Sequence, residues 1–255
     1  MKRLEDLFRK KSAGILNVYV TAGFPELDST LPLLKTLQDS GADIIELGMP
    51  YSDPLADGPV IQQSGSIALE NGMTISTLLK QLNGFRNTID VPVILMGYMN
   101  PVMQYGFERF CADASSVGVD ALILPDLPMH EFETQYRAIL EKYNLDFIFL
   151  VTPETSEERI HKIDSLSTGF VYAVSSSSTT GSNKSLNTSD SYFQRLKDMK
   201  LKNKLLIGFG IADKESFDHA CRYANGAIIG SAFIKALHGR KDAVEAAREF
   251  VKGLR

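Results

Sequence analysis

Short apolar segments alternate with longer amphipathic ones along the entire chain. Eight segments of four to seven residues, bounded by turn-forming residues, predict strands at 15–21, 43–47, 93–97, 121–124, 147–151, 170–174, 205–208 and 227–230. Between them, apolar residues recur at helical spacing and predict helices at 29–39, 74–86, 107–115, 131–143, 157–163, 191–199, 214–223 and 241–252. Strands and helices that alternate in this way are typical of βα units around a parallel sheet.

The number of strands favours a closed barrel. Eight strands, each followed by a helix, are enough to form a (β/α)8 TIM barrel, and closure removes the two edges that an open doubly wound sheet would expose. No linker or change of composition divides the chain, so we expect residues 1–255 to form a single domain. Ahead of the first strand, Leu4, Leu7 and Phe8 form a helical stripe, which predicts an extra N-terminal helix on the barrel floor.

Composition and charge narrow the range of partners. Hydrophobic residues make up 44% of the chain and charged residues 23%, values that allow a large core and give no sign of disorder. The net charge is -4 and no face-long run of Lys and Arg occurs, which argues against a nucleic-acid partner. No stretch reaches the roughly 18 apolar residues of a membrane span, and the N-terminus has no signal-peptide core, so we expect a cytoplasmic protein.

The sequence does not indicate metal or disulfide chemistry. Cys111 and Cys221 match no metal-binding spacing and are too few to staple a fold of this size, so we expect reduced, structural thiols. No ligand spacing relates the four histidines, His130, His161, His219 and His238. We therefore expect no metal in this chain.

The second predicted strand points a carboxylate into the barrel. Because strand side chains alternate, Glu46 shares the interior face with Ile44, and the intervening Ile45 faces the helices. Glu46 also lies at the carboxyl end of its strand, where barrel enzymes keep their catalytic groups. A salt-bridged structural glutamate is the alternative interpretation.

A loop stiffened by prolines follows this strand. Residues 49–59 end by starting a helix at Pro59, and they present Asp53 and Asp57. A loop of this length can extend over more than about 30 Å, so spacing alone does not bring Asp57 to Glu46. Taken by itself, Asp57 is equally consistent with an Asx turn or with a residue that starts a helix.

Two glycine-containing loops are candidates for binding phosphate. Gly208, Phe209 and Gly210 follow the seventh predicted strand, and Gly230 and Ser231 follow the eighth. Glycines leave backbone N–H groups unhindered, and barrels commonly bind phosphate at these two loops beside a short helix N-terminus. Either loop alone would be interpreted as a tight turn, whereas the two together indicate a phosphate site.

Several motifs together resemble one protein family. The order Glu46-Leu47-Gly48, then Ser52-Asp53-Pro54-Leu55-Ala56-Asp57-Gly58-Pro59, then Ile61-Gln62 is similar to the signature of tryptophan synthase alpha subunits. The resemblance continues through Tyr19-Val20-Thr21-Ala22-Gly23, Tyr98-Met99-Asn100-Pro101, Pro125-Asp126-Leu127-Pro128, Gly208-Phe209-Gly210-Ile211 and Gly230-Ser231. It implies a barrel lyase of tryptophan biosynthesis that cleaves indole-3-glycerol phosphate to indole and glyceraldehyde 3-phosphate.

The resemblance also implies roles for individual residues. Glu46 and Asp57 would be the catalytic acid/base pair: Glu46 would protonate C3 of the indole ring, and ionised Asp57 would accept the indole N–H and balance the growing charge. The substrate-binding residues implied in the same way are Tyr19, Met96, Ile123, Tyr172, Thr180 and Phe209. The implied phosphate-binding residues are Gly181, Gly210, Gly230 and Ser231.

A protein partner follows from the same resemblance. The family forms an alpha-beta-beta-alpha complex in which indole passes to a beta subunit that carries pyridoxal phosphate, so no cofactor is expected in this chain. The contact rim implied by the family is formed by Asp53, Pro54, Leu55, Asn100 and Pro128.

A serine-rich segment at 175–191 departs from the family's pattern. Members commonly have a glycine and a valine before the final Thr-Gly, and only Thr180 and Gly181 match here. Such a loop at a barrel mouth often acts as a lid, with a passive connector as the alternative. Two rival functions also stay open: another phosphate-binding barrel enzyme, such as an isomerase of the same pathway, and a binding module that activates a partner.

Overall fold

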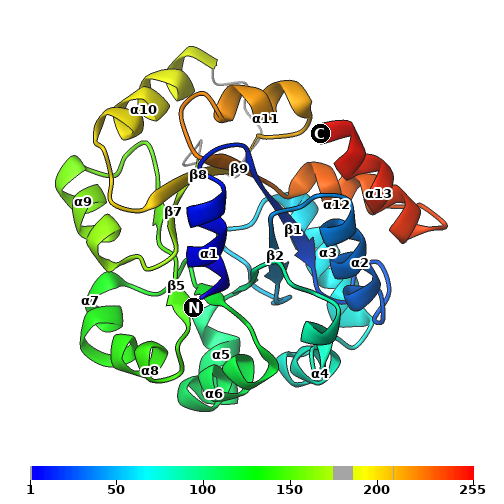
Figure 1. The fold of residues 1–255 in the computed structure, drawn as a ribbon. Coiled ribbons are helices and arrows are strands. Elements are labelled where there is room, and N and C mark those ends of the chain that lie inside the picture. Colours follow the sequence, from blue (N-terminus) through cyan, green and yellow to red (C-terminus); the bar gives the residue numbers. More distant parts are fainter. Residues whose placement is uncertain (1, 175–185, 209) are drawn as a thin grey trace.

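Parallel strands surrounded by helices make up the structure (Figure 1). It is a computed structural model that describes residues 2–174, 186–208 and 210–255, with only the backbone at 186–189. The strands form one parallel sheet in the order β5-β4-β3-β2-β1-β9-β8-β7-β6. Their bounds are Ile15–Thr21 (β1), Ile44–Gly48 (β2), Val93–Met96 (β3), Ala121–Ile123 (β4), Asp146–Phe147 (β5), Leu150–Val151 (β6), Phe170–Val174 (β7), Lys204–Gly208 (β8) and Gly226–Ile229 (β9).

The two ends of this sheet belong to one chain segment, so the sheet closes into a barrel. β5 pairs with β4, β6 pairs with β7, and residues 148 and 149 join β5 to β6. Within this joint, the Ile148 N–H donates to Leu122 O (3.1 Å), and Phe149 O accepts from the Tyr172 N–H (3.0 Å). The predicted eight-stranded barrel is confirmed, with its fifth strand in two pieces.

Two side chains from the next loop interrupt the fifth strand. The Phe147 N–H donates to Thr168 Oγ1 (2.9 Å) and the Phe149 N–H donates to Ser167 Oγ (3.4 Å). These hydroxyls take the place of backbone acceptors from a neighbouring strand. The prediction of one continuous strand at 147–151 is therefore wrong, because apolar periodicity contains no information on such distant hydroxyl groups.

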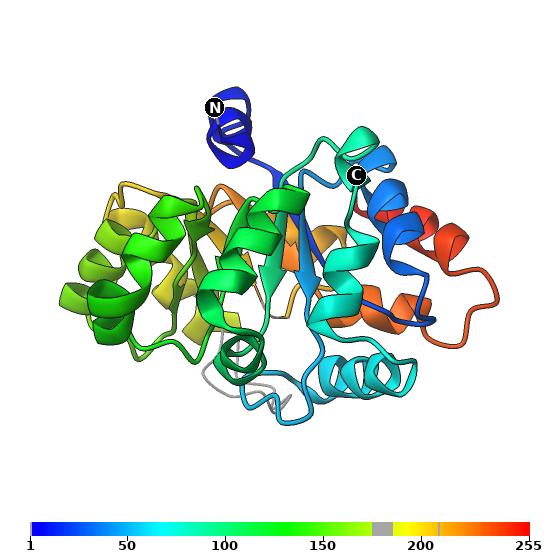
Figure 2. The ribbon, with the colours of Figure 1, turned by 90° about the horizontal axis from the view of Figure 1, so that it is seen from below.

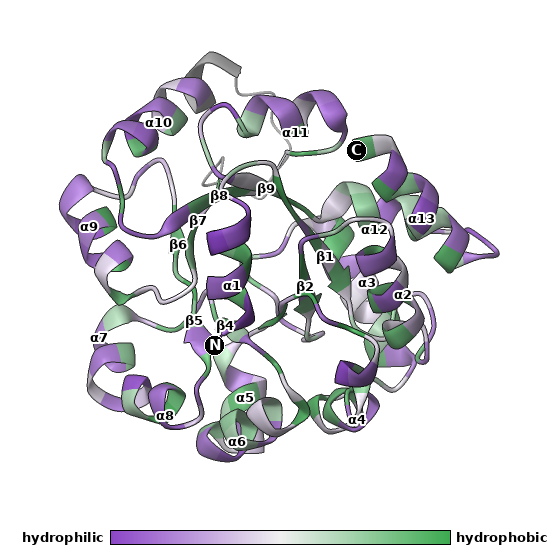
Figure 3. Ribbon diagram, viewed as in Figure 1, coloured by the Kyte–Doolittle hydropathy of each residue, from purple (hydrophilic) through white to green (hydrophobic). Residues whose placement is uncertain are grey.

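Apart from α1, the helices pack around the outside of the barrel, with their green, apolar faces inward and purple, polar faces outward (Figure 3). Their bounds are Arg3–Lys10 (α1), Thr30–Asp39 (α2), Pro59–Glu70 (α3), Ile75–Gln81 (α4), Met99–Tyr105 (α5), Phe107–Val117 (α6), Met129–Glu131 (α7), Arg137–Lys142 (α8), Glu157–Leu166 (α9), Leu186–Asp198 (α10), Lys214–Ala220 (α11), Ser231–Leu237 (α12) and Ala243–Leu254 (α13). A π-helical turn, Phe132–Tyr136, joins α7 to α8. No helix in the described ranges has the length and apolar character needed to cross a membrane.

The helix predicted at 74–86 ends earlier than expected. α4 begins after Thr74, whose side chain accepts from the Thr77 N–H, and it stops at Gln81. Gly84 then has a φ of 77°, a left-handed conformation that terminates helices, and Phe85–Asn87 forms a separate 3-10 turn. Gly84, which lies inside the predicted helix, thus marks where that helix ends.

Two short helices, α5 and α12, have no counterpart among the helices predicted from periodicity. Each has seven residues, which is too short for a clear amphipathic repeat. α12 begins at Ser231, directly after Gly230, and so places a helix N-terminus at the carboxyl end of the eighth barrel strand.

α1 covers the floor of the barrel, as predicted. Figure 1 shows it across the barrel opening, and Figure 2 shows it at the end of the barrel opposite to α3. Lys2 Nζ pairs with Asp146 Oδ1 (2.7 Å), Arg3 Nη1 pairs with Asp120 Oδ1 (3.0 Å), and the Phe8 ring meets Phe170 edge-on. The carboxyl ends of the strands therefore remain free of α1, and the candidate site lies there.

Candidate active site

Glu46 lies inside the barrel, as strand alternation predicts. Its side chain is only 1% exposed, and Tyr19 of β1 and Ile94 of β3 flank it in register. Asn17 Nδ2 of β1 donates to Glu46 Oε2 (3.1 Å). No ion pair to Glu46 occurs in the described part of the chain, so nothing there supports the interpretation as a salt-bridged structural glutamate.

Burial controls the protonation of Glu46. Desolvation raises the pKa of this carboxyl from 4.5 to about 8, opposed by the hydrogen bond from Asn17 and reinforced by the negative charge of Asp57. At neutral pH most of the Glu46 side chains therefore carry a proton. A buried carboxylic acid of this kind is suited to donate that proton.

Asp57 lies close enough to Glu46 for their charges to interact, which the sequence spacing alone did not determine. The Tyr98 side chain hydrogen-bonds Asp57, and Gln62 Nε2 of α3 donates to Asp57 O (2.8 Å). Burial raises the pKa of Asp57 from 3.8 to about 6, and the hydrogen bond with Tyr98 opposes this rise. Near neutral pH Asp57 is mostly ionised, in contrast to Glu46.

Two tyrosine rings fill the barrel beside these carboxyl groups, and a glycine on the neighbouring strand makes room for each. A Cβ atom at Gly48 would overlap the Tyr19 hydroxyl, and one at Gly208 would overlap the Tyr172 ring. Burial raises the pKa of both tyrosines, and the charges of Glu46 and Asp57 raise them further. Tyr19 and Tyr172 are therefore neutral neighbours of the carboxyl pair.

Met96 and Ile123 continue this surface on the next two strands. Met96 pairs in register with Gly48 and Ile123 with Met96, so both share the inward face of Glu46. Each is less than one-tenth exposed. Met96 and Ile123 thus lie on the same face of the sheet as Glu46. Phe209, Thr180 and Gly181 lie outside the described residues, as does most of segment 175–191.

The two glycine loops end neighbouring strands. Gly208 is the last residue of β8 and Gly210 follows it, while Gly230 and Ser231 follow β9, which pairs with β8 and β1. Gly210 is exposed, and a Cβ atom at Gly230 would lie 3.4 Å from the Tyr19 Cβ. Tyr19 therefore lies between the Gly230 loop and Glu46.

The residues assigned to a contact rim lie on two loops and at the start of α5, and hydrogen bonds connect these three segments. Asn100 Nδ2 donates to the Tyr51 hydroxyl (2.8 Å), the Ala56 N–H donates to the Tyr98 hydroxyl (3.0 Å), and the Met99 N–H donates to the Asp126 carboxylate (3.0 Å). At the surface of these loops, Leu55 is 91% exposed, and Asp53, Asn100 and Pro128 are exposed as well, while Pro54 is half-buried.

Three supporting residues were missed at the sequence level. Asn17 is the one polar side chain in the apolar run that precedes Tyr19, and its position two residues earlier places it on the same inward face. Tyr98 and Gln62 both stand within the motifs that carry the family resemblance. Their roles depend on where the loop after β2 folds back, and this cannot be inferred from strand alternation.

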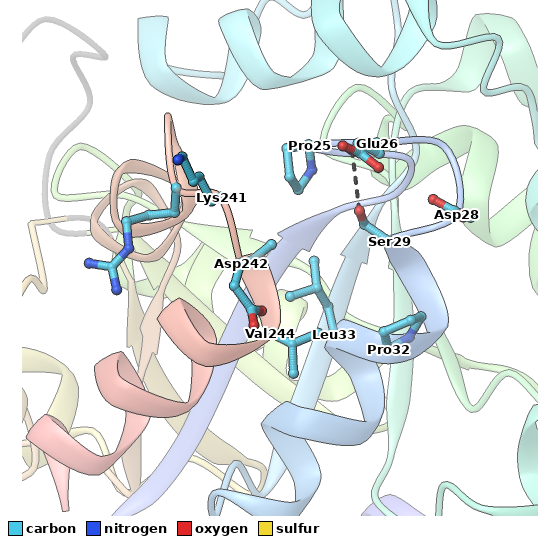
Figure 4. Close-up of a pocket in the computed structure, with 11 residues that line it drawn as sticks. Pro25, Glu26, Asp28, Ser29, Pro32, Leu33, Lys241, Asp242 and Val244 are labelled. Atoms are coloured by element: carbon cyan, nitrogen blue, oxygen red, sulfur yellow. Dashed lines mark hydrogen bonds between the residues drawn. The ribbon is translucent and has the colours of Figure 1, made fainter.

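The groove in Figure 4 is a separate feature. It lies between the loop after β1 and the connection of α12 to α13, and it contains neither Glu46 nor Asp57. Its lining mixes acidic and basic side chains and includes Pro25, Glu26, Asp28, Lys241 and Asp242. Across the described ranges, no cluster of three or more His, Cys, Asp or Glu side chains is arranged to hold a metal ion.

Comparisons with known proteins agree with this geometry. The family model described as tryptophan synthase alpha chain matches residues 6–254. The alpha chain of Christiangramia forsetii is 52% identical over 88% of both chains, and that of Parabacteroides distasonis is 46% identical over 100% of both. The crystal structure of the alpha subunit from Legionella pneumophila superposes with a TM-score of 0.90 at 34% identity, covering 100% of this chain and 97% of that one.

The fold and the site define a (β/α)8-barrel enzyme with two neighbouring carboxyl groups of different acidity at its mouth. The chain belongs to the tryptophan synthase alpha chain family. It is accordingly a lyase of tryptophan biosynthesis.

Proposed function

We propose that this chain cleaves indole-3-glycerol phosphate to indole and glyceraldehyde 3-phosphate with Glu46 and Asp57 as its acid/base pair. One observation supports these roles above all: burial gives Glu46 a pKa of about 8 and Asp57 a pKa of about 6. The two groups therefore hold opposite protonation states at neutral pH, which is the arrangement that an acid and an anionic partner need.

The proposed chemistry begins with proton transfer. Glu46 donates its proton to C3 of the indole ring, and the ring becomes an iminium-like acceptor of electrons. The bond from C3 to the glycerol carbon then breaks, and its electron pair restores the aromatic ring. The hydroxyl on the departing carbon releases its proton to the Glu46 carboxylate, which leaves an aldehyde and regenerates the acid.

Asp57 would stabilise the charged intermediate. Its carboxylate accepts the indole N–H and balances the positive charge on the ring, and the hydrogen bond with Tyr98 fixes its orientation. Tyr19, Met96, Ile123 and Tyr172 would form the apolar surface for the indole, together with Phe209 and Thr180. The phosphate would bind at backbone N–H groups of Gly181, Gly210, Gly230 and Ser231.

Two isosteric substitutions test the proposed catalytic pair. We expect Glu46→Gln and Asp57→Asn each to lower kcat for indole release by about 10²- to 10⁴-fold with little change in substrate binding, since amides can neither donate the proton nor balance the charge. Glu46→Gln should be slower, and the double variant little slower still, because both groups act on one transition state. Purified protein assayed with indole-3-glycerol phosphate gives this comparison.

The exposed Glu70→Gln variant is the matched control, and its turnover should equal that of the unmodified chain. Near-normal turnover of Glu46→Gln would overturn the assignment. If the unmodified chain releases no indole but isomerises a phosphorylated substrate, the rival isomerase reading holds.

The partner proposed for the rim is a tryptophan synthase beta subunit that carries pyridoxal phosphate, in an alpha-beta-beta-alpha complex. The exposure of the apolar Leu55 side chain on a loop tied to Tyr98 supports contact at this place. Leu55→Asp should weaken beta binding at least about tenfold in titration calorimetry, whereas Glu70→Gln should not. Equal affinities would place the interface elsewhere.

We also propose that the protein is located in the cytoplasm.

A further inference from the structure

Asn17 is a fully buried polar residue that lies deeper in the barrel than the catalytic pair. It stands on β1 in register with Ile44 on one side and Ile228 on the other, and its exposed fraction is 0%. Burying an amide among apolar side chains is unfavourable unless hydrogen bonds compensate. The burial of Asn17 therefore indicates that this residue has a role in the site.

The hydrogen bonds of Asn17 point to a single partner. Its Nδ2 atom donates to Glu46 Oε2 at 3.1 Å, and its Oδ1 atom has no partner in the described part of the chain. An asparagine that served only to stabilise the fold would be expected to satisfy both ends of the amide. Here the amide leaves its carbonyl unpaired while it contacts the carboxyl that we assign as the acid.

We propose that Asn17 is a positioning residue for Glu46. The side-chain N–H of Asn17 donates to Glu46 Oε2, and this hydrogen bond keeps the transferable proton on Glu46 Oε1. The inference rests on the proposed role of Glu46. A carbonyl-type oxygen is a better acceptor than the hydroxyl oxygen of an acid, so the N–H donor selects the tautomer. It also restrains rotation of the carboxyl group, which holds the proton in one direction relative to the bound ring.

The same contact limits how far burial raises the pKa of Glu46. A donor to the carboxylate favours the charged form, and the hydrogen bond from Asn17 lowers the pKa of Glu46 against desolvation. The other titratable groups that act on Glu46 or face it are Asp57, Tyr19 and Tyr172. None of these donates to Oε2 within the described residues, so Asn17 is the group whose removal should change that oxygen.

Asn17→Leu removes both polar atoms at similar volume, and the pH profile of kcat/KM gives the first readout. We expect the alkaline limb to move upward by about one pH unit, because the carboxylate loses its donor. The maximal kcat should fall by about tenfold with KM nearly unchanged, because the proton is no longer held in one direction. Ser64→Ala, which removes a buried hydrogen bond to Thr21 and none to Glu46, should leave the alkaline limb in place.

A titration that does not depend on turnover separates this inference from the proposed function. Carboxyl ¹³C NMR of glutamate-labelled protein reports the Glu46 pKa, and the spectrum of Glu46→Gln assigns the resonance. An upward shift in Asn17→Leu supports the contact even if Glu46→Gln remained active, a result that would overturn only the catalytic role.

An unchanged Glu46 pKa in folded Asn17→Leu would overturn the inference. A downward shift would overturn it too, because it would mean that the amide is reversed and Oδ1 accepts the Glu46 proton. Asn17→Ala serves if the leucine does not fold, since it adds no volume and also lacks the donor. The same upward shift is expected there, and its absence would contradict the proposed hydrogen bond.

Discussion

Two carboxyl groups in one site differ in acidity because the barrel surrounds them differently. Glu46 projects from the middle of the sheet, where the neutral amide of Asn17 is its hydrogen-bond donor. Asp57 belongs to a loop at the mouth and has the Tyr98 hydroxyl as its donor. The less complete desolvation of Asp57 leaves it the stronger acid of the two.

This difference predicts a bell-shaped pH dependence of kcat/KM. Asp57 must be ionised, so activity should rise as pH increases through about 6, and Glu46 must be protonated, so activity should fall above about 8. Initial rates of indole release from pH 5 to 9.5 measure the profile. Asp57→Asn should remove the acid limb and move the alkaline one to lower pH, because the charge of Asp57 no longer raises the Glu46 pKa. A profile that stays unchanged would contradict the assignment of the two limbs.

At the scale of elements, acidic side chains at the amino ends of strands anchor the barrel floor. Asp120, just before β4, accepts hydrogen bonds from Arg3, from Arg86 and from the Val93 N–H. Asp43, just before β2, pairs with Lys11 and with Arg255. These contacts join α1 and other distant segments to the amino ends of β2 and β4.

Asp120→Asn should therefore destabilise the fold by about 2–3 kcal/mol, because two guanidinium groups lose their counter-charge in a largely buried place. Urea unfolding at neutral pH measures the change. Asp39→Asn breaks an exposed pair with Lys35 and should cost no more than about 0.5 kcal/mol. Equal losses in the two variants would show that the floor contacts add little.

The sequence predicted elements well where one apolar face repeats, and poorly where the structure depends on a distant group. The strands of the barrel follow from their continuous apolar runs, and the inward position of Glu46 follows from alternation along its strand. The interruption of the fifth strand by Ser167 and Thr168 does not, because it needs two hydroxyl groups that approach from a loop. The place of Asp57 needed the resemblance for the same reason, since only the folded loop brings it to Glu46.

On the scale of the whole molecule, the floor and the mouth of the barrel differ in function. The floor is covered by α1 and tied by ion pairs, whereas the mouth gathers the carboxyl pair, the glycine loops and the exposed rim. A ligand that binds at the mouth of the folded chain should therefore stabilise all elements together.

The single domain expected for residues 1–255 stays a prediction.

A non-cleavable analogue of indole-3-glycerol phosphate should raise the melting temperature by about 5–10 °C at one hundred times its Kd. Differential scanning fluorimetry measures the shift. Gly230→Val should remove most of it by obstructing the backbone N–H groups at the start of α12, while Gly253→Val, at an open position on α13, should keep it. Full retention of the shift in Gly230→Val would exclude this loop as the phosphate site.

The contact of Tyr19 with Gly48 also has an evolutionary consequence. Because even one added methyl group at position 48 would overlap the tyrosine hydroxyl, position 48 cannot take a larger residue while Tyr19 is present. The same holds for Tyr172 and Gly208 on the other side of the barrel. Related chains should therefore show covariation between strands that are far apart in sequence: a larger residue at either glycine position should occur only with a smaller one in place of the tyrosine.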